Sequence, residues 1–337
     1  MNVRSSAIAP RRCWRGRPAR NVRTMNPPVV HLDSVGVTYQ SRRLRDSGTI
    51  AAVSGVTLAI ERGQTLGLVG ESGSGKTTLG KLCLGMIRPT QGTVQLNGQP
   101  FPRHRRELKG RLAVVLQHPE WALNPRLRVG ISVAEPLSIA RSLPSGKVDA
   151  TVEDMLSKVG LEPVLARRYP HELSGGQRQR LAIARALITH PQFVVFDEAV
   201  SALDVSIQSQ VLNLIKDLQA SEGFAALFIS HDIAVTRYVA HTIGVMYQGE
   251  LVEQAPASTF YLKPKHPYSR ALRLTLAEED RAAFTFKDTT GSESARGCLF
   301  SVRCPWAVDR CFADKPGLRD VEGSRSACHR AEEVGAA

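Results

Sequence analysis

The sequence lacks any apolar run long enough to cross a bilayer. Its 337 residues are 42% apolar and 22% charged, the balance of an ordinary globular protein. A membrane-spanning helix needs roughly 18 to 20 apolar residues. The most apolar stretches, Leu112–Leu116 and Phe193–Phe196, have only the length of single strands. The sequence therefore predicts a chain that does not span a membrane by itself.

Acidic residues are absent from the first 24 residues, which carry seven arginines. This segment holds over half of the formal net charge of +13, so the remainder of the chain gives little reason to expect nucleic acid as a partner. It also lacks the apolar core of a secretory signal and the amphipathic period of a transit peptide. Two interpretations stay open for residues 1–25: a disordered arm, or a translation start placed too early, with Met25 as the true initiator.

Cysteine is scarce outside the C-terminal region. Four of the six cysteines lie in the last forty residues, whereas Cys13 and Cys83 are isolated. In a chain without a secretory signal, such a cluster favours a metal over disulfides. The gaps of five, six and sixteen residues are wider than the C-x-x-C pairs of a typical zinc site, but four thiolates suffice for either tetrahedral zinc or a [4Fe-4S] cluster. The candidate ligands are Cys298, Cys304, Cys311 and Cys328.

The pattern of apolar residues changes along the chain. Alternating residues between Val29 and Ile60 predict antiparallel strands. Further on, the apolar strands Thr65–Val69, Phe193–Phe196 and Ala225–Ile229 alternate with helix-like stretches, which predicts a mainly parallel sheet. Residues 118–190 are expected to be mostly helical, and from about residue 262 the chain becomes polar and rich in proline and cysteine, as in a small appended unit.

A complete G-x-x-x-x-G-K-[ST] motif occupies Gly70–Thr77, between a strand and a helix. Its glycines allow backbone N–H groups to surround phosphates, Lys76 can neutralise the outer phosphates, and the Thr77 hydroxyl can ligate magnesium. By itself the motif does not separate a kinase, a GTPase, a motor and a transporter. The candidate nucleotide-binding residues are Gly70, Ser72, Gly73, Gly75, Lys76, Thr77 and Thr78.

A second motif, Leu173-Ser174-Gly175-Gly176-Gln177, opens a helix, and the apolar strand that follows ends in Asp197-Glu198. With this order and spacing the sequence resembles the ABC ATPase family, whose signature is LSGGQ followed by such a strand. A helix N-terminus at Ser174, Gly175, Gly176 and Gln177 suits the γ-phosphate of a nucleotide bound mainly by another subunit. The resemblance therefore implies a site that is complete only in a dimer, with ATP and Mg²⁺ as cofactors.

The resemblance also assigns expected roles to single residues. Asp197 would hold magnesium, and Glu198 would orient or deprotonate the attacking water. Gln117 is similar to the Q-loop glutamine that senses magnesium, and His231 to the switch histidine that contacts the γ-phosphate. Asp204 closes a segment similar to the D-loop, which communicates across the dimer.

Tyr39 has two possible interpretations. It resembles the aromatic residue that stacks on adenine, but a tyrosine at the end of an early strand is also a common core residue. Ala199 stands where ABC proteins commonly have proline, and we expect no loss of hydrolysis from this difference.

A narrower resemblance covers residues 28–330. Leu123–Arg126, His266–Leu272, Gly297–Phe300 and Arg303–Pro305 are similar to the oligopeptide/dipeptide/nickel permease ATPases. The resemblance implies a peripheral subunit on the cytoplasmic face of the membrane. It would pair with a second ABC ATPase, usually a different one, beneath two transmembrane permease subunits served by an extracytoplasmic solute-binding protein. It also favours an iron-sulfur cluster over zinc at the cysteines.

The expected fold is accordingly an α/β P-loop ABC nucleotide-binding domain, with a mainly parallel RecA-like sheet, an antiparallel β subdomain and a helical subdomain. We expect this domain at residues 26–265 and a cysteine-bearing C-terminal region at residues 266–330.

Other functions within the wider ABC family carry less support. An ABC protein acting on ribosomes or DNA is disfavoured because the chain has one phosphate loop and one LSGGQ, with only about 120 residues between Thr77 and Asp197. An exporter ATPase is disfavoured only by the C-terminal motifs. The transported solute stays open among a peptide, a nickel chelate, glutathione and another small polar molecule.

Overall fold

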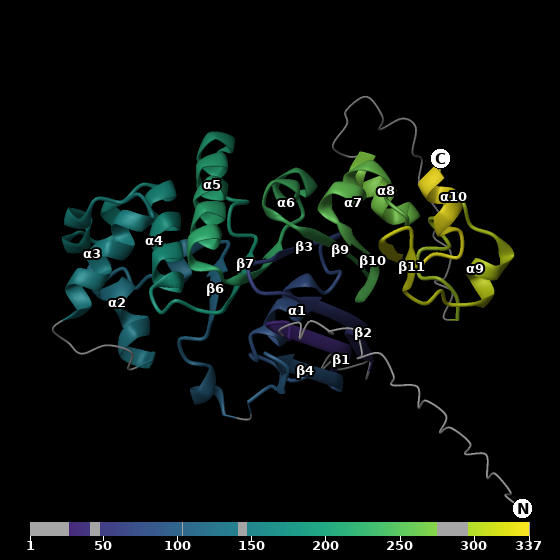
Figure 1. Ribbon diagram of the computed structural model, residues 1–337, viewed down its shortest axis with the longest axis horizontal. Helices are drawn as coiled ribbons and strands as arrows, with labels where there is room; N and C mark the ends of the chain where they lie inside the picture. Colours follow the sequence, from purple (N-terminus) through teal and green to yellow (C-terminus); the bar gives the residue numbers. More distant parts are fainter. Residues whose placement is uncertain (1–26, 41–47, 103, 141–146, 275–295, 337) are drawn as a thin grey trace, which may run out of the picture.

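The framework of the protein is an eight-stranded sheet, seen near the middle of Figure 1. The computed structural model describes residues 27–40, 48–102, 104–140, 147–274 and 296–336, so the leader 1–25 lies outside the described residues. The strand order is β11-β12-β10-β9-β3-β8-β7-β6. In chain order the strands are β3 Thr65–Val69, β6 Leu112–Leu116, β7 Phe193–Asp197, β8 Ala225–Ile229, β9 Thr242–Tyr247, β10 Glu250–Pro256, β11 Arg319–Val321 and β12 Ser324–Ser326.

The five strands β9, β3, β8, β7 and β6 run parallel. All residues of β3 and β8 are buried, as expected for short apolar strands with helices on both faces. Figure 1 shows α1 (Lys76–Cys83) on one face, and α5 (Val205–Glu222) and α6 (Ile233–Val239) on the other. The predicted mainly parallel sheet is therefore confirmed.

A second, antiparallel sheet has the order β2-β1-β4-β5. It shares one core with α1 and the central strands, built around Leu32, Leu58, Leu79 and Leu227. This packing places α1 between the two sheets (Figure 1). Its strands are β1 Val30–Gln40, β2 Thr49–Ile60, β4 Gln91–Leu96 and β5 Gln99–Pro100.

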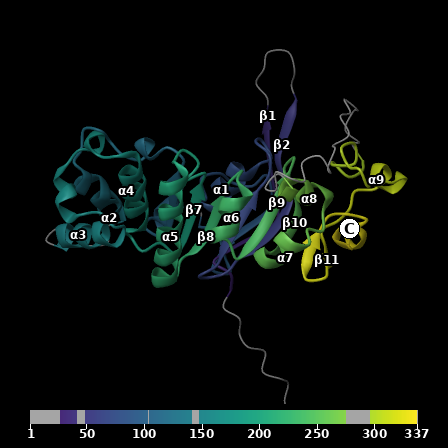
Figure 2. The ribbon, with the colours of Figure 1, turned by 90° about the horizontal axis from the view of Figure 1, so that it is seen from above.

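The helical subdomain lies at one end of the molecule in Figures 1 and 2. Its helices pack on an apolar core that continues to the sheet and includes Val133, Leu156, Leu181 and Phe196. The helices are α2 Val129–Ala140, α3 Val148–Lys158 and α4 Gly175–Leu187, with the short 3₁₀ turns η2 Pro119–Trp121, η4 Pro163–Arg167 and η5 Pro170–Glu172; a further turn, η1 Arg105–Leu108, precedes β6. None of the described helices is long and apolar enough to cross a membrane.

The C-terminal region lies at the opposite end and is part of the central sheet (Figures 1 and 2). Its strand β12 pairs with β10, and β11 pairs with β12. Phe260, Tyr268 and Phe300 form a shared core with β9 and β10. This continuity was not apparent from the sequence, which suggested an appended unit. The helices here are α7 Ala257–Leu262, α8 Pro267–Leu274, α9 Asp309–Ala313 and α10 Ala331–Ala336.

Candidate nucleotide-binding and catalytic site

Four loops with sequence-predicted site residues leave the same edge of the sheet. Gly70 follows β3, Gln117 follows β6, Glu198 follows β7, and His231 comes two residues after β8. Because β3, β8, β7 and β6 are parallel neighbours, their carboxyl ends lie side by side, where ligands of open α/β sheets bind. The topology therefore brings together residues that are far apart in the sequence.

The loop Gly70–Gly75 needs glycine at both ends. Gly70 has φ of 149° and Gly75 has φ of 98°, a region that side chains rarely adopt. A Cβ atom at Gly70 would lie 2.2 Å from the Met246 carbonyl oxygen, and one at Gly75 would lie 2.3 Å from that of Ala52. Only glycine allows the loop to pass this close to its neighbours before α1 begins at Lys76. The helix N-terminus then offers free N–H groups to an anion.

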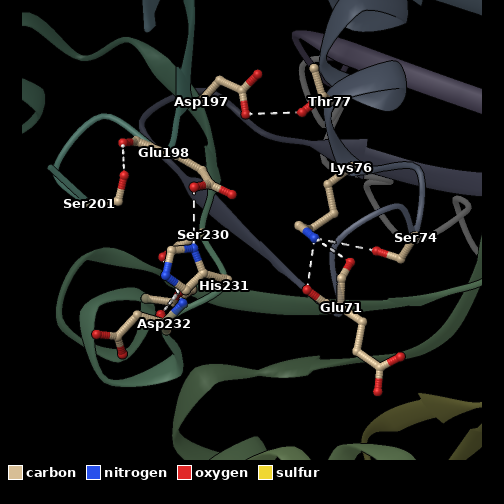
Figure 3. A network of polar contacts seen from close by, with 12 residues as sticks. Glu71, Ser74, Lys76, Thr77, Asp197, Glu198, Ser201, Ser230, His231 and Asp232 are labelled. Atoms are coloured by element: carbon tan, nitrogen blue, oxygen red, sulfur yellow. Dashed lines mark hydrogen bonds and ion pairs between the residues drawn. The ribbon is translucent and has the colours of Figure 1, made fainter. Parts of the chain in front are cut away.

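Lys76 is buried inside the loop. Its Nζ donates to the carbonyl oxygens of Gly70 and Glu71, both at 2.7 Å, and to Ser74 Oγ at 3.4 Å (Figure 3). Burial lowers the pKa of Lys76, while the charges of Glu198, Asp197 and Glu71 oppose that shift. The Lys76 ammonium group therefore lies at the centre of the loop, where the charges of Asp197 and Glu198 act on it. The remaining loop residues Ser72 and Gly73 are exposed, and Thr77 and Thr78 lie in the first turn of α1.

Thr77 and Asp197 meet across the site. Thr77 Oγ1 donates a hydrogen bond of 3.3 Å to Asp197 Oδ1 (Figure 3). Burial raises the pKa of Asp197, and the neighbouring charge of Glu198 adds to that increase, whereas the bond from Thr77 opposes it. A hydroxyl and two carboxylates of this kind form an oxygen donor set suited to Mg²⁺. The residues present therefore fit this ion.

Glu198 has a backbone conformation unusual for a residue with a side chain. Its φ is 50°, and its N–H donates to the Ile229 carbonyl at 3.0 Å. The Ser201 hydroxyl donates to the Glu198 carbonyl at 2.9 Å, which closes the turn. The Glu198 side chain reaches His231, with 3.2 Å between Oε2 and Nδ1 (Figure 3). Strained conformations held by their surroundings are common at functional sites.

The signature turn lies in the helical subdomain, at the start of α4. Ser174 caps the helix: its Oγ accepts from the Gln177 N–H at 3.3 Å, and its N–H donates to Gln177 Oε1 at 2.9 Å. Ser174 and Gly175 are exposed, and a Cβ at the buried Gly176 would lie 2.9 Å from Ile207 Cγ2. The helix N-terminus is thus presented to solvent, where an anion can approach it.

Three further predicted residues lie at or near the ends of strands and helices. Gln117 is half-buried and follows Leu116, which pairs with Asp197 between β6 and β7. Asp204 is exposed at the N-cap of α5. Tyr39 is 44% exposed near the end of β1, so the structure does not place it in the core.

The four C-terminal cysteines line one small cavity together with His266, Phe300 and Trp306. All four are free thiols, and burial raises the pKa of Cys304 to about 12 and that of Cys328 to about 11. Among the described residues, no group of three or more His, Cys, Asp or Glu side chains is arranged to hold a metal ion. The cluster thus brings together the predicted ligands, but a metal there stays a prediction.

The sequence assigned no specific role to a loop residue, Glu71, or to the two residues that contact it from the C-terminal region. Glu71 contacts Tyr268 and Arg303 from the C-terminal region. Their only signal in the sequence was the position of Tyr268 and Arg303 within two motifs of the permease ATPases.

Comparison with known proteins places this geometry in a family. A family model described as "ABC transporter" matches residues 53–201, and one described as "Oligopeptide/dipeptide transporter, C-terminal region" matches residues 252–311. A Brucella abortus protein described as a peptide import ATP-binding protein is 46% identical over 289 residues, 83% of this chain and 86% of the relative. The chain belongs to the ABC transporter ATP-binding protein family.

A second relative and a solved structure support the same family assignment. A Bacillus subtilis protein described as an oligopeptide transport ATP-binding protein, YkfD, is 39% identical over 90% of this chain and 95% of its own. The dimeric ATP-binding cassette MJ0796, solved in a post-hydrolysis state with ADP and Pi, has a TM-score of 0.61 at 28% identity and covers 68% of this chain and 98% of its own. The predicted fold is thereby confirmed, and the chain is an ABC ATPase that uses ATP and Mg²⁺.

Proposed function

We propose that this ATPase drives import of peptides, or of a related small solute of the peptide and nickel class, through partner membrane subunits. The main support is that one chain matches two family models. The ABC transporter model matches residues 53–201, and the oligopeptide/dipeptide transporter C-terminal model matches residues 252–311. Relatives with identities of 39–46% are described as peptide or oligopeptide transport ATP-binding proteins.

The proposed assembly contains two ATPase subunits and two transmembrane permease subunits, with an extracytoplasmic solute-binding protein that delivers the solute. The second ATPase is proposed to be a related but different chain, because the segment Val200–Gln208 resembles the second ATPase of such pairs. The chain is proposed to sit on the cytoplasmic face of the inner membrane, where its partners can transmit closure and reopening of the dimer to the permeases.

Within the site we propose that Lys76 and the N–H groups of the loop bind the outer phosphates of ATP. Thr77, Asp197 and Gln117 would hold magnesium, which supplies charge neutralisation on the phosphates. The oxygen donors of Thr77 and Asp197, which already meet at 3.3 Å, support this assignment. Tyr39, exposed near the end of β1, is proposed to stack on adenine.

We propose that Glu198 orients and deprotonates the attacking water, and that His231 contacts the γ-phosphate and holds the Glu198 carboxylate in place. Their separation of 3.2 Å supports this division of roles. The partner subunit would complete the site with the equivalent of Ser174, Gly175, Gly176 and Gln177, which cap a helix N-terminus here, and Asp204 is proposed to lie near the dimer interface.

The C-terminal cysteines are proposed to take up a [4Fe-4S] cluster, with zinc as the alternative metal. Four thiols around one cavity provide the right number and type of ligand. The role would be structural or redox-sensing, because ATP hydrolysis transfers no electrons. Anaerobic purification with iron and sulfide analysis tests this. Colourless, iron-free protein and a Cys304→Ser variant of unchanged stability would contradict it.

Reconstitution tests the proposed transport function directly. The chain is purified with its membrane partners, placed in proteoliposomes, and assayed for ATP hydrolysis and for uptake of labelled peptides. We expect hydrolysis that rises when the solute-loaded binding protein is added. Co-purification with ribosomes, and the absence of any permease subunit, would contradict the proposal.

A further inference from the structure

Glu71 joins the phosphate loop to the C-terminal region through three different groups. Its carbonyl oxygen accepts from Lys76 Nζ at 2.7 Å, inside the loop. Its N–H donates to Tyr268 Oη at 2.9 Å. Its carboxylate receives both terminal nitrogens of Arg303, Nη2 to Oε1 at 3.1 Å and Nη1 to Oε2 at 3.2 Å. One loop residue is therefore held from outside by two residues that lie about 200 positions later in the chain.

Tyr268 and Arg303 are themselves fixed by an aromatic cluster. Tyr268 is fully buried, with ring centroids 4.7 Å from Tyr247 and 5.5 Å from Phe300. The Arg303 guanidinium lies 5.9 Å from the ring centroids of Tyr247 and Phe300, and its Nη1 donates to Tyr247 Oη at 3.4 Å. Tyr247 ends β9, the strand next to β3, from which the loop starts. The side chains that support the contact therefore pack against the strand next to the one from which the loop starts.

The ion pair between Arg303 and Glu71 orients the Glu71 side chain more than it stabilises the fold. The Arg303 and Glu71 side chains are 33% and 47% exposed, and a pair this open contributes little free energy of folding. Two parallel hydrogen bonds nevertheless fix the direction of the carboxylate. Figure 3 shows this carboxylate pointing away from Lys76, so it leaves the phosphate side of the loop open. The bond from the Glu71 N–H to Tyr268 fixes the peptide plane of the loop at the same residue.

We infer that Tyr268 and Arg303 are positioning residues for ATP binding, which hold the phosphate loop through Glu71 in the conformation that receives the phosphates. The inference rests on the proposed phosphate-binding role of the loop. Neither residue reaches Asp197 or Glu198 through the contacts described above, so they act through Glu71 and not on the attacking water. The C-terminal region would then belong to the nucleotide site, although its motifs lie outside the ATPase motifs of the sequence.

The test compares Arg303→Gln, Glu71→Gln and the double variant in the assembled transporter, with KM for ATP and kcat measured separately. Each single change removes the same ion pair, so we expect KM for ATP to rise about three- to fivefold with kcat unchanged. The double variant should show no further rise, because the pair is already lost. Arg310→Gln is the matched control, since Arg310 pairs with Asp314 in the same region.

Tyr268→Phe removes the hydroxyl that accepts from the loop and keeps the aromatic packing. It should also raise KM for ATP, without the loss of thermal stability expected for Tyr268→Ala. Equilibrium binding to the full chain measures the affinity for ATP independently of transport. Unchanged ATP affinity in both Arg303→Gln and Tyr268→Phe would overturn this inference and leave the ATPase and import proposals intact. Additive effects in the double variant would overturn the assignment of the Arg303–Glu71 pair.

Discussion

The Glu198 carboxylate lies 3.2 Å from the imidazole of His231, with the two residues placed by the neighbouring strands β7 and β8. Both line a cavity of about 140 Å³, together with Ser201, Ser230 and Asp232. The N–H bond to Ile229 holds the backbone of Glu198 at its positive φ, and the contact with His231 orients its side chain before any ligand binds. Such preorganisation is what a water-activating carboxylate requires.

Replacing Lys76 should remove the central cation of the phosphate loop. In Lys76→Ala the carbonyl oxygens of Gly70 and Glu71 lose their donor, and no ammonium remains to bind the outer phosphates. We expect affinity for ATP to fall by about tenfold or more, the cost of losing a charged hydrogen-bond partner. Equilibrium binding of a fluorescent ATP analogue measures this. Lys216→Ala, an exposed lysine on α5, is the control, and equal affinity in the two variants would contradict the assignment.

The two central glycines of the signature turn should respond differently to alanine. A Cβ at Gly176 would press on Ile207 at 2.9 Å, whereas a Cβ at Gly175 meets nothing within 4 Å. Gly176→Ala should therefore lower the free energy of unfolding by about 1–3 kcal/mol, as for overpacked core positions. Gly175→Ala should leave it nearly unchanged. Urea unfolding measures the free energy of unfolding of both variants. Equal values would show that Gly176 at the start of α4 does not pack on Ile207 of α5.

Stability should fall with rising pH because of Glu253. Burial raises the pKa of Glu253 from 4.5 to about 7, although the N–H groups of Lys265 and His266 and the charge of Lys265 oppose the shift. The folded protein therefore holds this proton more tightly than the unfolded chain. The stability that it contributes is full below pH 4.5 and is lost as the pH rises through 7.

Urea unfolding at pH 5 and at pH 8 measures the effect of Glu253. Glu253→Gln cannot titrate, so it should lose less stability than wild type between the two pH values. His266, whose pKa burial lowers from 6.5 to about 3, stays neutral in the folded protein but takes up a proton in the unfolded chain at pH 5. Its contribution to stability therefore rises with pH, and it cancels when wild type is compared with Glu253→Gln. Identical losses in wild type and variant would contradict the buried position of this carboxyl group.

Much of the fold and of the nucleotide site could be predicted from the sequence, because short apolar strands and the loops after them have local patterns. Asp197 ends such a strand, Lys76 and His231 come after two others, and parallel pairing places all three at one edge. Gly70–Thr77 needs no distant residue to be recognised. The β12 strand has only three residues, too few for a period, so its pairing with β10 could not be predicted.

The contact between Arg303 and Glu71 could not be predicted for a different reason. The two residues are 232 positions apart, and neither periodicity nor motif spacing carries information on such a pair. The exposure of Tyr39 also depends on packing that no local pattern encodes. The cysteines were recognised as a group, but only the structure shows that all four line one cavity.

Single-turnover and steady-state ATP hydrolysis by Glu198→Gln, measured in the assembled transporter, tests the account most directly. The phosphate loop is intact in this variant, so we predict that ATP binding is retained and that a closed, nucleotide-bound dimer accumulates. Turnover should fall by about 10²- to 10⁴-fold, the contribution of a general base. The matched control is Glu153→Gln, an exposed glutamate on α3, which should hydrolyse ATP at the wild-type rate. Wild-type turnover by Glu198→Gln would contradict the catalytic role of this carboxylate.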